Sequence, residues 1–518
     1  MLQIKNLNIQ HKKDLRTITE GFNLVLNDGD KAVMIGEEGN GKSTIMKWIV
    51  DPDLIEDYAE SEGERLLGNE RIGYLPQELP ASEGEKTIYE FFCEEPLFFD
   101  KNPGELAELA GRFSLEGDFY YGDQKMKSLS GGEKIKAQLM RILVSEPTVL
   151  LFDEPSNDID IETLELLEKL INGWKHAVLY ISHDETLIEN TANMIVHIEQ
   201  IMKKRKSRYC VVHDSYRSYI KNRMEGFEKQ EQEALNDRRE KKIRDEKYRK
   251  LMQKVEHAQA GVSRQDPATG RLLKKKMHAV KSIGRRFERE DENMTEMPEK
   301  EDAIFFTFAE GENSIPAGKT VIEFSMDRLV TPDGERVLSE DVFLRVRGPE
   351  RICITGTNGC GKTTLLKLMA DRLLDRKDIN AQYMPQNYED VLDPDMTPVE
   401  FLDDTGDKEI RTRIRTHLGS LKYTTAEMDH PIRELSGGQK AKIFLLKMSL
   451  SGANVLILDE PTRNFSPLSG PVIREMLSSF PGAIISISHD RKYINEVCIG
   501  VYRLTEKGLI SGMQRQTV

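Results

Sequence analysis

The chain has 518 residues, 38% of them hydrophobic and 31% charged, so it is long enough for about three domains and apolar enough for more than one core. No stretch approaches the roughly 18 consecutive apolar residues of a membrane-spanning helix, and the first residues lack the apolar core of a secretory signal. The five cysteines form no Cys-x-x-Cys pair. We therefore expect a reduced, cytoplasmic protein without membrane insertion, a disulfide framework or a zinc ribbon.

The charge of the chain is unevenly distributed. The net charge is −14, from 74 basic and 88 acidic residues. Residues 241–290 contain 16 basic and 6 acidic side chains, a local charge of +10, which leaves −24 for the rest. A solvated helix face is one explanation of such a segment. The other is nucleic-acid binding, because an acidic body repels phosphates and one basic segment would direct the contact to one place.

Four short motifs occur twice, in the same order along the chain. They are Gly36–Thr44 and Gly356–Thr364, Leu129–Glu133 and Leu435–Gln439, Asp153–Pro155 and Asp459–Pro461, and Ser182–Asp184 and Ser488–Asp490. The last three pairs are each separated by 306 positions. Such a repeat predicts two homologous domains, residues 1–205 and 315–518, joined by a linker at 206–314.

Short apolar runs without alternation precede or contain most of these motifs. They are Ala32–Ile35, Val149–Phe152, Ala177–Ile181, Arg351–Ile354, Val455–Leu458 and Ala483–Ile487. Runs of this kind are typical of strands covered on both faces, as in a parallel sheet with crossover helices. We therefore predict an α/β fold in both domains.

Both glycine-rich loops fit the pattern G-x-x-x-x-G-K-[S/T] between a strand and a helix, the arrangement that wraps phosphate groups in backbone N–H groups. Lys42 and Lys362 are expected to reach the β- and γ-phosphates of a nucleotide, and Ser43 and Thr363 to offer hydroxyls to Mg²⁺. The predicted nucleotide-binding residues are Gly36, Gly39, Asn40, Gly41, Lys42, Ser43 and Thr44 in the first loop, and Gly356, Asn358, Gly359, Gly361, Lys362, Thr363 and Thr364 in the second.

Acidic residues and histidines follow the other apolar runs. Asp153 and Asp459 end two of them, where a carboxylate can hold the hydration shell of Mg²⁺. Glu154 and Glu460 come next, placed to polarise an attacking water molecule. A lone histidine is usually a packed or solvated residue, but His183 and His489 stand in the same Ser-His-Asp setting, so we predict a contact with the γ-phosphate.

The order of these motifs resembles that of the ATP-binding-cassette ATPases over both domains. The Leu-Ser-Gly-Gly signature distinguishes this family from other phosphate-loop proteins, and Gln77 and Gln386 match its glutamine loop. The resemblance implies an ATP hydrolase that uses Mg²⁺ and whose two domains form an intramolecular dimer within a monomeric chain. Gln77 and Gln386 would join the catalytic and Mg²⁺-binding residues.

In this family each signature motif closes the ATP site of the opposite domain. Site one would use Lys42, Ser43, Gln77, Asp153, Glu154 and His183, closed by Ser436, Gly437 and Gly438. Site two would use Lys362, Thr363, Gln386, Asp459, Glu460 and His489, closed by Ser130, Gly131 and Gly132. The loop Thr462–Leu468 lacks the aspartate usual in the family, so equal turnover at the two sites is in doubt. His11 is a weak candidate for the aromatic residue that stacks on adenine.

The linker contains a predicted basic helical hairpin. Residues from Asp214 to about His257 read as one long charged helix, and Asp266-Pro267 resembles the start of a return helix. Leu273, Met277 and Val280 recur at a spacing that would pack this helix on the outgoing one. The basic residues available for contact with nucleic acid are Arg264, Arg271, Lys274, Lys275, Lys276, Lys281, Arg285 and Arg286, and the resemblance to the ABC-F proteins, given next, implies that they contact RNA.

A twin cassette with an interdomain hairpin resembles the ABC-F proteins, and Thr462–Leu468 is similar to the antibiotic-resistance members of Gram-positive bacteria. By that resemblance the hairpin, with its tip at about 259–272, enters the 70S ribosome at the tRNA exit site and contacts 23S rRNA and P-site tRNA. ATP would favour binding to the ribosome, and hydrolysis of the ATP would release the protein. The implied function is protection from lincosamides, pleuromutilins and streptogramin A. The alternatives are a housekeeping translation factor, the ATPase motor of an exporter and a DNA-binding ATPase.

Overall fold

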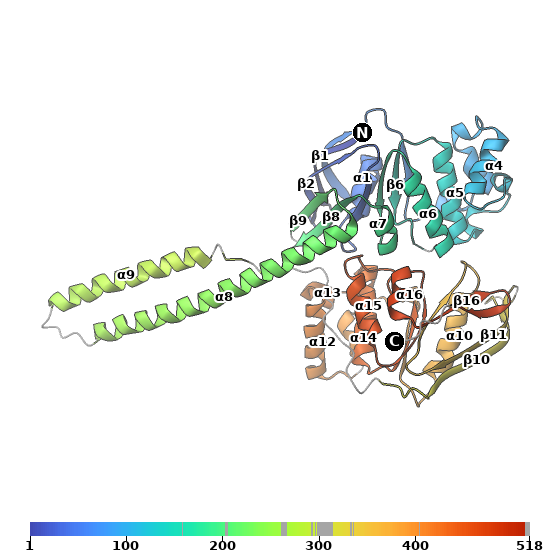
Figure 1. The fold of residues 1–518 in the computed structure, drawn as a ribbon. Coiled ribbons are helices and arrows are strands. Elements are labelled where there is room, and N and C mark those ends of the chain that lie inside the picture. The colour runs from blue at the N-terminus through green and yellow to red at the C-terminus, as the bar shows by residue number, and fades with distance from the viewer. Residues whose placement is uncertain are drawn as a thin grey trace. The chain divides into compact units, whose positions relative to one another are not determined.

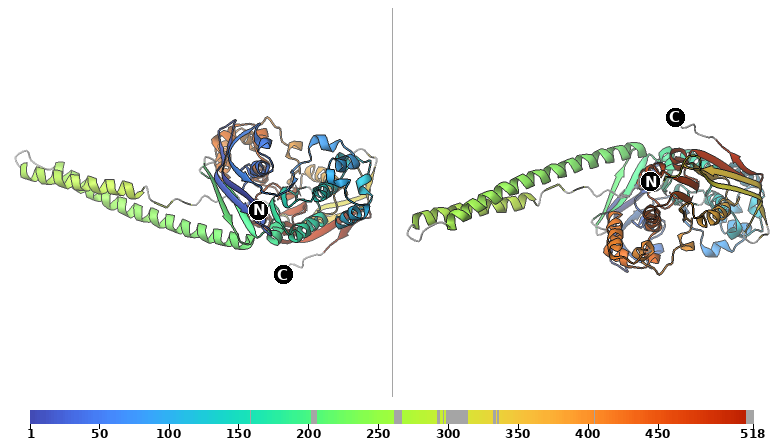
Figure 2. Two further views of the ribbon diagram at one scale, coloured as in Figure 1. Left: turned by 90° about the horizontal axis from the view of Figure 1, so that it is seen from above. Right: turned by 90° about the horizontal axis from the view of Figure 1, so that it is seen from below.

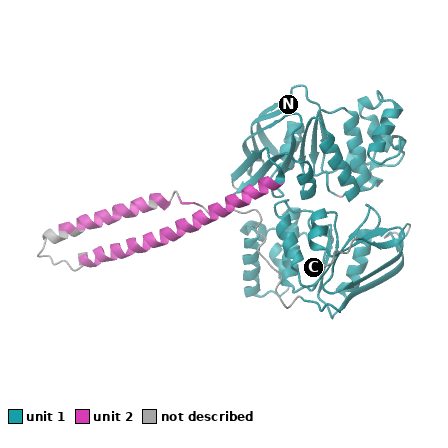
Figure 3. Ribbon diagram, in the orientation of Figure 1, with its two compact units in different colours: residues 1–216, 301–518 teal, residues 217–300 magenta. Residues whose placement is uncertain are grey.

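The computed structural model describes residues 1–157, 159–201, 206–260, 267–291, 294, 295, 297, 314–331, 334, 336–403 and 405–512. They form two compact units, residues 1–216 with 301–518 and residues 217–300 (Figure 3). The first unit contains both sequence repeats, here called the first repeat (1–212) and the second repeat (314–512). None of the helices in the described part of the chain is both long and apolar enough to cross a membrane.

Each repeat is built on a six-stranded sheet, and the two sheets have the same strand order. The first sheet runs β5-β6-β7-β3-β8-β9, with strands Ile72–Leu75, Val149–Asp153, Ala177–Ile181, Lys31–Ile35, Met194–Ile201 and Lys206–Val212. The second runs β13-β14-β15-β12-β16-β17, with strands Ala381–Met384, Val455–Asp459, Ala483–Ile487, Arg351–Thr355, Gly500–Thr505 and Gly508–Ser511. The last pair in each is antiparallel, and β9 extends the first sheet beyond the boundary expected at residue 205.

The predicted apolar runs are the central strands of these sheets, and every residue of β6, β7, β14 and β15 is buried. In the first sheet β7 pairs in parallel with both β6 and β3, and in the second β15 pairs in the same way with β14 and β12. Parallel strands that are neighbours end at the same edge of their sheet. In each sheet, the residues that follow the three parallel strands therefore lie close together at that edge.

Helices and short 3₁₀ turns connect the strands (Figure 1). In the first repeat the helices are α1 Lys42–Val50, α2 Ala81–Gly84, α3 Ile88–Cys93, α4 Pro103–Arg112, α5 Gly131–Val144, α6 Ile161–Gly173 and α7 Glu185–Thr191. In the second they are α10 Lys362–Leu374, α11 Pro398–Leu402, α12 Lys408–Ser420, α13 Thr425–Asp429, α14 Gly437–Leu450, α15 Gly470–Ser478 and α16 Arg491–Val497. The 3₁₀ turns are Pro52–Ile55, Pro96–Phe98, Phe119–Tyr121, Met126–Ser128, Tyr388–Asp390 and Ile432–Glu434.

A smaller antiparallel sheet, which the sequence analysis did not predict, accompanies each large one. In the first repeat it is β2-β1-β4, with strands Thr17–Leu26, Leu2–His11 and Ala59–Leu66. In the second it is β10-β11, Thr320–Val330 and Val337–Arg347. In each repeat one hydrophobic core joins the small sheet, the helix after the glycine loop and the large sheet. The glycine loop is therefore supported from both sides by packed apolar residues.

The second unit is the predicted helical hairpin. Helix α8 spans Tyr216–Ala260, about 68 Å at 1.5 Å per residue, and α9 spans Pro267–Asp291, beginning at the predicted proline. The two helices lie side by side in Figures 1 and 2. Val255 and Val280 are buried, Met277 is half-buried, and the Leu273 side chain and residues 261–266 of the predicted tip lie outside the described residues.

Contacts along the hairpin pair the helices in antiparallel register. Arg244 Nη1 lies 3.2 Å from Glu290 Oε2, and its guanidinium also lies 4.5 Å from the ring centroid of Phe287. The Tyr248 ring packs edge-on against Phe287, and a Cβ at position 284 would lie 2.6 Å from the Tyr248 hydroxyl. Gly284 therefore allows the close approach of the two helices.

The two repeats contact each other through charged side chains, acidic in the first and basic in the second. The Arg474 guanidinium of α15 holds the Glu185 carboxylate of α7 at 2.6 and 3.3 Å, and both side chains are about 95% buried. Lys492 of α16 lies 2.9 Å from the same carboxylate, and Arg491 pairs with Glu168 of α6. These ion pairs between acidic residues of the first repeat and basic residues of the second hold the two repeats together.

Replacing Arg474 with methionine is expected to destabilise the protein by about 3 kcal/mol, because Glu185 keeps a buried charge without its bidentate partner. Thermal unfolding should show a midpoint several degrees lower than that of the unsubstituted protein. Arg415→Met, which removes an exposed pair with Asp429, is the control and should shift the midpoint little. Equal shifts for the two variants would contradict a structural role of the buried pair.

Candidate nucleotide sites

Each glycine-rich loop connects a central strand to a helix, as predicted. β3 leads through Gly36–Gly41 into α1, and β12 leads through Gly356–Gly361 into α10. Gly36 has a φ of +146°, and a Cβ there would lie 2.2 Å from the carbonyl oxygen of Ile198, so the loop needs glycine at this point. The loop brings the N-terminus of a helix to the edge of the sheet, which is a favourable position for phosphate.

The two loop lysines occupy equivalent positions. Lys42 Nζ donates to the carbonyl oxygens of Gly36 and Glu37 at 2.9 and 3.0 Å. Lys362 Nζ donates to Gly356 and Thr357 at the same distances. Both lysines are more than nine-tenths buried, so each loop holds one cation over its own backbone, where phosphate oxygens would meet it.

The two predicted Mg²⁺-binding aspartates end β6 and β14, beside the loop hydroxyls. Ser43 Oγ donates to Asp153 Oδ1 at 2.9 Å, and Thr363 hydrogen-bonds Asp459. Burial raises the pKa of both aspartates to about 6. The Oδ2 atom of each is buried without a hydrogen-bond partner.

Glu154 and Glu460 share an unusual backbone conformation directly after these strands. Their φ angles are +53° and +52°, and their N–H groups donate to the carbonyl oxygens of Ile181 and Ile487 at the end of the neighbouring strand. A glutamate rarely adopts a left-handed conformation, and such strain persists where the surrounding structure enforces it. The turn fixes each carboxylate at the end of its strand, beside the histidine of the next.

The two glutamate–histidine pairs differ. His183 Nε2 lies 2.9 Å from Glu154 Oε1, whereas His489 Nε2 lies 3.7 Å from Glu460 Oε1. Burial alone would raise the pKa of Glu154, but the charge and hydrogen bond of His183 bring it below its usual value. Burial and then the neighbouring Asp459 raise the pKa of Glu460 to about 8, and burial with Lys362 lowers that of His489 to about 4.

These carboxylates fit a divalent cation. Buried oxygen atoms without partners and raised carboxyl pKa values mark positions where an added positive charge would be stabilised. Carboxylate and hydroxyl oxygens are the ligands that Mg²⁺ prefers, together with phosphates. The first site offers Ser43 and Asp153 for this purpose, and the second offers Thr363 and Asp459.

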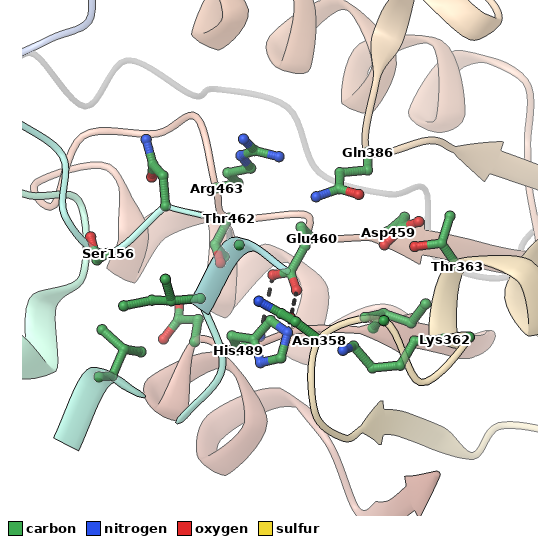
Figure 4. Close-up of a pocket in the computed structure, with 18 of the residues that line it drawn as sticks. Ser156, Asn358, Lys362, Thr363, Gln386, Asp459, Glu460, Thr462, Arg463 and His489 are labelled. Carbon is green, nitrogen blue, oxygen red and sulfur yellow. Dashed lines mark hydrogen bonds and ion pairs between the residues drawn. The ribbon is translucent and has the colours of Figure 1, made fainter. Parts of the chain in front are cut away.

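Two cavities lie at these loops, each lined by both repeats. The larger, of about 460 Å³, contains the second glycine loop together with Gly131, Ser156 and Asn157 of the first repeat (Figure 4). The smaller, of about 330 Å³, contains the first glycine loop together with Arg463 and Asn464 of the second repeat. Each cavity is thus lined by residues of both repeats, and Gly131 is the one signature-motif residue among the described lining residues of the two cavities.

Most of the predicted site residues line these cavities. Those at the smaller cavity are Gly39, Gly41, Lys42, Ser43, Thr44, Gln77, Glu154 and His183. Those at the larger are Gly131, His183, Asn358, Gly359, Gly361, Lys362, Thr363, Thr364, Gln386, Asp459, Glu460 and His489. The predicted residues not among the lining residues are Gly36, Asn40, Ser130, Gly132, Asp153, Gly356, Ser436, Gly437 and Gly438. The Asn40 side chain instead donates to the carbonyl oxygen of Ile198 at 3.1 Å and so secures the loop to β8.

The cavities also contain His11, the candidate for stacking on adenine, and residues that the sequence analysis missed. His11 lines the smaller cavity next to Tyr58, with ring centroids 6.3 Å apart, so two rings flank this site. Arg463 lines both cavities, and Asn464 lines the smaller. Arg463 could have been found from the 306-residue offset, which aligns it with Asn157, another lining residue. Tyr58 lies just before β4 and carries no motif.

The described residues that were predicted to contact RNA lie on α9 with their side chains in solvent. Those described, all of them exposed, are Arg271, Lys274, Lys275, Lys276, Lys281, Arg285 and Arg286. Arg286 also pairs with Glu290 at 3.3 Å. The remaining candidate, Arg264, lies outside the described residues.

Comparisons with known proteins agree with this geometry. The profile of the family described as ABC transporter matches residues 19–157 and 339–463. The chain is 27% identical to the ATP-binding protein Uup of Escherichia coli K12, over 92% of this chain and 76% of Uup. It is 26% identical to the ribosome protection protein VmlR of Bacillus subtilis 168, over 97% of this chain and 86% of VmlR.

Solved structures share the twin-repeat fold. The archaeal ribosome recycling factor aABCE1, in its complex with the stalk protein aP1, aligns with a TM-score of 0.58 at 17% identity, over 98% of this chain and 90% of that one. Two phosphate-loop domains face each other, and each contributes lining residues to the cavity at the glycine loop of the other. This arrangement is that of a nucleotide-hydrolysing clamp. The chain belongs to the ATP-binding-cassette family, as an ATP hydrolase of the twin-cassette ABC-F type. The two repeats are its cassettes.

Proposed function

We propose that the chain is a cytoplasmic ABC-F ATPase that binds the 70S ribosome in its ATP-bound state and protects it from antibiotics of the peptidyl-transferase centre. The hairpin would enter at the tRNA exit site and contact 23S rRNA and P-site tRNA. Its tip would displace the drug or reshape the drug pocket, and ATP hydrolysis would release the protein. The drug classes are lincosamides, pleuromutilins and streptogramin A.

The observation that carries this proposal is the row of solvent-accessible basic side chains on α9. Eight lysines and arginines, the seven predicted contacts and Arg289, lie on one 25-residue helix of a chain whose net charge is −14. Lys and Arg side chains bind the RNA backbone with little dependence on sequence, and their effect adds over several phosphates. A spacer between two cassettes would need neither the return helix nor this charge.

Roles for the nucleotide-site residues follow from their positions. Lys42 and Lys362 would bind the β- and γ-phosphates of ATP, and Ser43, Asp153, Thr363 and Asp459 would hold Mg²⁺, with Gln77 and Gln386 at its water shell. Bound Mg²⁺ would neutralise charge on the phosphates. Glu154 and Glu460 would then orient and deprotonate water, and His183 and His489 would contact the γ-phosphate.

One relative supports the resistance role over the alternatives. VmlR, which matches 97% of this chain, is named a ribosome protection protein. A housekeeping translation factor with the same hairpin is the second candidate, since Uup, named only an ATP-binding protein, is about equally similar. The motor of an exporter and a DNA-binding ATPase lack a comparable observation in their favour.

Expression in a drug-susceptible Gram-positive host tests the proposal. We expect higher minimal inhibitory concentrations of a lincosamide, a pleuromutilin and streptogramin A, and no change for a drug that acts on the small subunit. The variant Lys42→Met with Lys362→Met, which should not bind ATP, is expected to restore susceptibility. Unchanged susceptibility with the native chain would overturn the resistance role, and co-purification with a membrane protein instead of ribosomes would favour an exporter.

A further inference from the structure

A glutamate of the first glycine loop contacts the signature motif of the second cassette. The carboxylate of Glu38 accepts hydrogen bonds from the backbone N–H of Gly437, at 3.2 Å, and from that of Gly438. These glycines form the first turn of α14. Two segments that are far apart in the sequence are therefore joined directly across site one.

The first turn of α14 is shaped to receive an anion. Ser436 caps the helix and its hydroxyl accepts from the backbone N–H of Gln439, which leaves the N–H groups of Gly437 and Gly438 directed at Glu38. A Cβ at Gly438 would lie 2.9 Å from Glu38 Oε2 and 2.7 Å from the carbonyl oxygen of Asn464. N–H groups of the first helical turn, which have no partner within the helix, and the helix dipole together favour a negative charge at this point.

Site two lacks a carboxylate that could accept hydrogen bonds from the signature motif in this way, because the position equivalent to Glu38 is Asn358, an uncharged residue. The backbone N–H of Asn358 is directed at the Asp160 carboxylate of the first cassette. The cavities differ accordingly. The signature residue Gly131 lines the cavity at site two, whereas Glu38 lines the cavity at site one and no described residue of Ser436–Gly438 does.

The γ-phosphate of ATP would compete with Glu38 for the same N–H groups. ATP bound to the first glycine loop places its phosphates between that loop and the α14 N-terminus, where the Glu38 carboxylate now lies. Two anions a few ångströms apart in a partly buried site repel each other strongly. The carboxylate must therefore withdraw before the γ-phosphate can contact the signature motif.

We propose that Glu38 is a built-in competitor for the triphosphate at site one. It holds the signature motif of the second cassette until ATP displaces it, so site one binds ATP more weakly than site two in the closed clamp. Glu38 thus sets the order in which the two sites fill, with site two first. This inference rests on ATP binding by the cassettes and is independent of ribosome binding.

Equilibrium binding of Mg·ATP and Mg·ADP to the purified full chain tests this proposal. Glu154→Gln and Glu460→Gln are present throughout to prevent turnover, and Lys362→Ala removes site two so that calorimetry reports on site one. Glu38→Gln is expected to raise ATP affinity at site one about tenfold, the effect of one charge-assisted hydrogen bond. ADP affinity should stay nearly unchanged, because ADP lacks the γ-phosphate that competes with Glu38.

The mirror variant and a surface control complete the design. Asn358→Glu, measured with Lys42→Ala in place of Lys362→Ala, should lower ATP affinity at site two. Glu62→Gln on exposed β4 changes the net charge by the same amount as Glu38→Gln and should change neither affinity. An ATP affinity at site one that does not rise with Glu38→Gln would overturn the proposal, as would an equal gain for ADP and ATP.

Discussion

Replacing Glu154 and Glu460 together with glutamine is expected to lower the rate of ATP hydrolysis by about two to three orders of magnitude while ATP binding persists. Each glutamate is fixed by a left-handed backbone at the end of a central strand, beside a histidine. Glutamine keeps the size and the turn but cannot accept a proton from water. The phosphate-binding lysines and the Mg²⁺-binding aspartates are unchanged in this variant.

Loss of hydrolysis without loss of binding should hold the clamp closed. By the proposed cycle the double variant accumulates on 70S ribosomes when ATP is present. Phosphate release, nucleotide binding and sedimentation through sucrose measure the three properties. Glu62→Gln with Glu323→Gln, one exposed glutamate on the small sheet of each cassette, is the matched control and should hydrolyse ATP normally. If the double variant binds ATP yet sediments free of ribosomes, release by hydrolysis is wrong.

The local motifs allowed much of the fold and both sites to be predicted. Residues such as Lys42 and Asp153 belong to short segments whose strand–loop–helix context is visible in hydrophobic patterning. Each of these motifs also occurs twice in the chain, which strengthens the prediction. The hairpin was also predictable, because a long charged run, a proline and a returning apolar spacing have direct helical consequences. The structure confirms the six central strands and both hairpin helices.

Features that depend on pairing between distant segments were not predictable. The strands β1, β2 and β4 form a sheet only because residues far apart in sequence align, and β9, which begins Lys206-Ser207-Arg208, reads as linker by composition. The contact of Glu38 with Gly438 and the buried Arg474–Glu185 pair arise where the two cassettes meet. The local sequence around these residues does not indicate that they contact the other cassette.

Neutralising the basic face of α9 is expected to abolish ribosome binding. The variant replaces all seven described basic candidates, Arg271, Lys274, Lys275, Lys276, Lys281, Arg285 and Arg286, with glutamine. Glutamine is nearly as good a helix former as lysine and arginine, so α9 should persist. Removal of several phosphate contacts lowers affinity about a thousandfold or more near physiological salt, and it should also reduce the salt dependence of any binding that remains.

Co-sedimentation with 70S ribosomes in the presence of ATP compares the native and neutralised hairpins, both in the Glu154→Gln, Glu460→Gln background. The claim that an ATP-driven clamp applies a cationic hairpin to ribosomal RNA predicts that the native hairpin pellets with ribosomes and the neutralised one stays in the supernatant. The neutralised chain with both glutamates intact should still hydrolyse ATP. Undiminished pelleting of the neutralised protein would contradict the account.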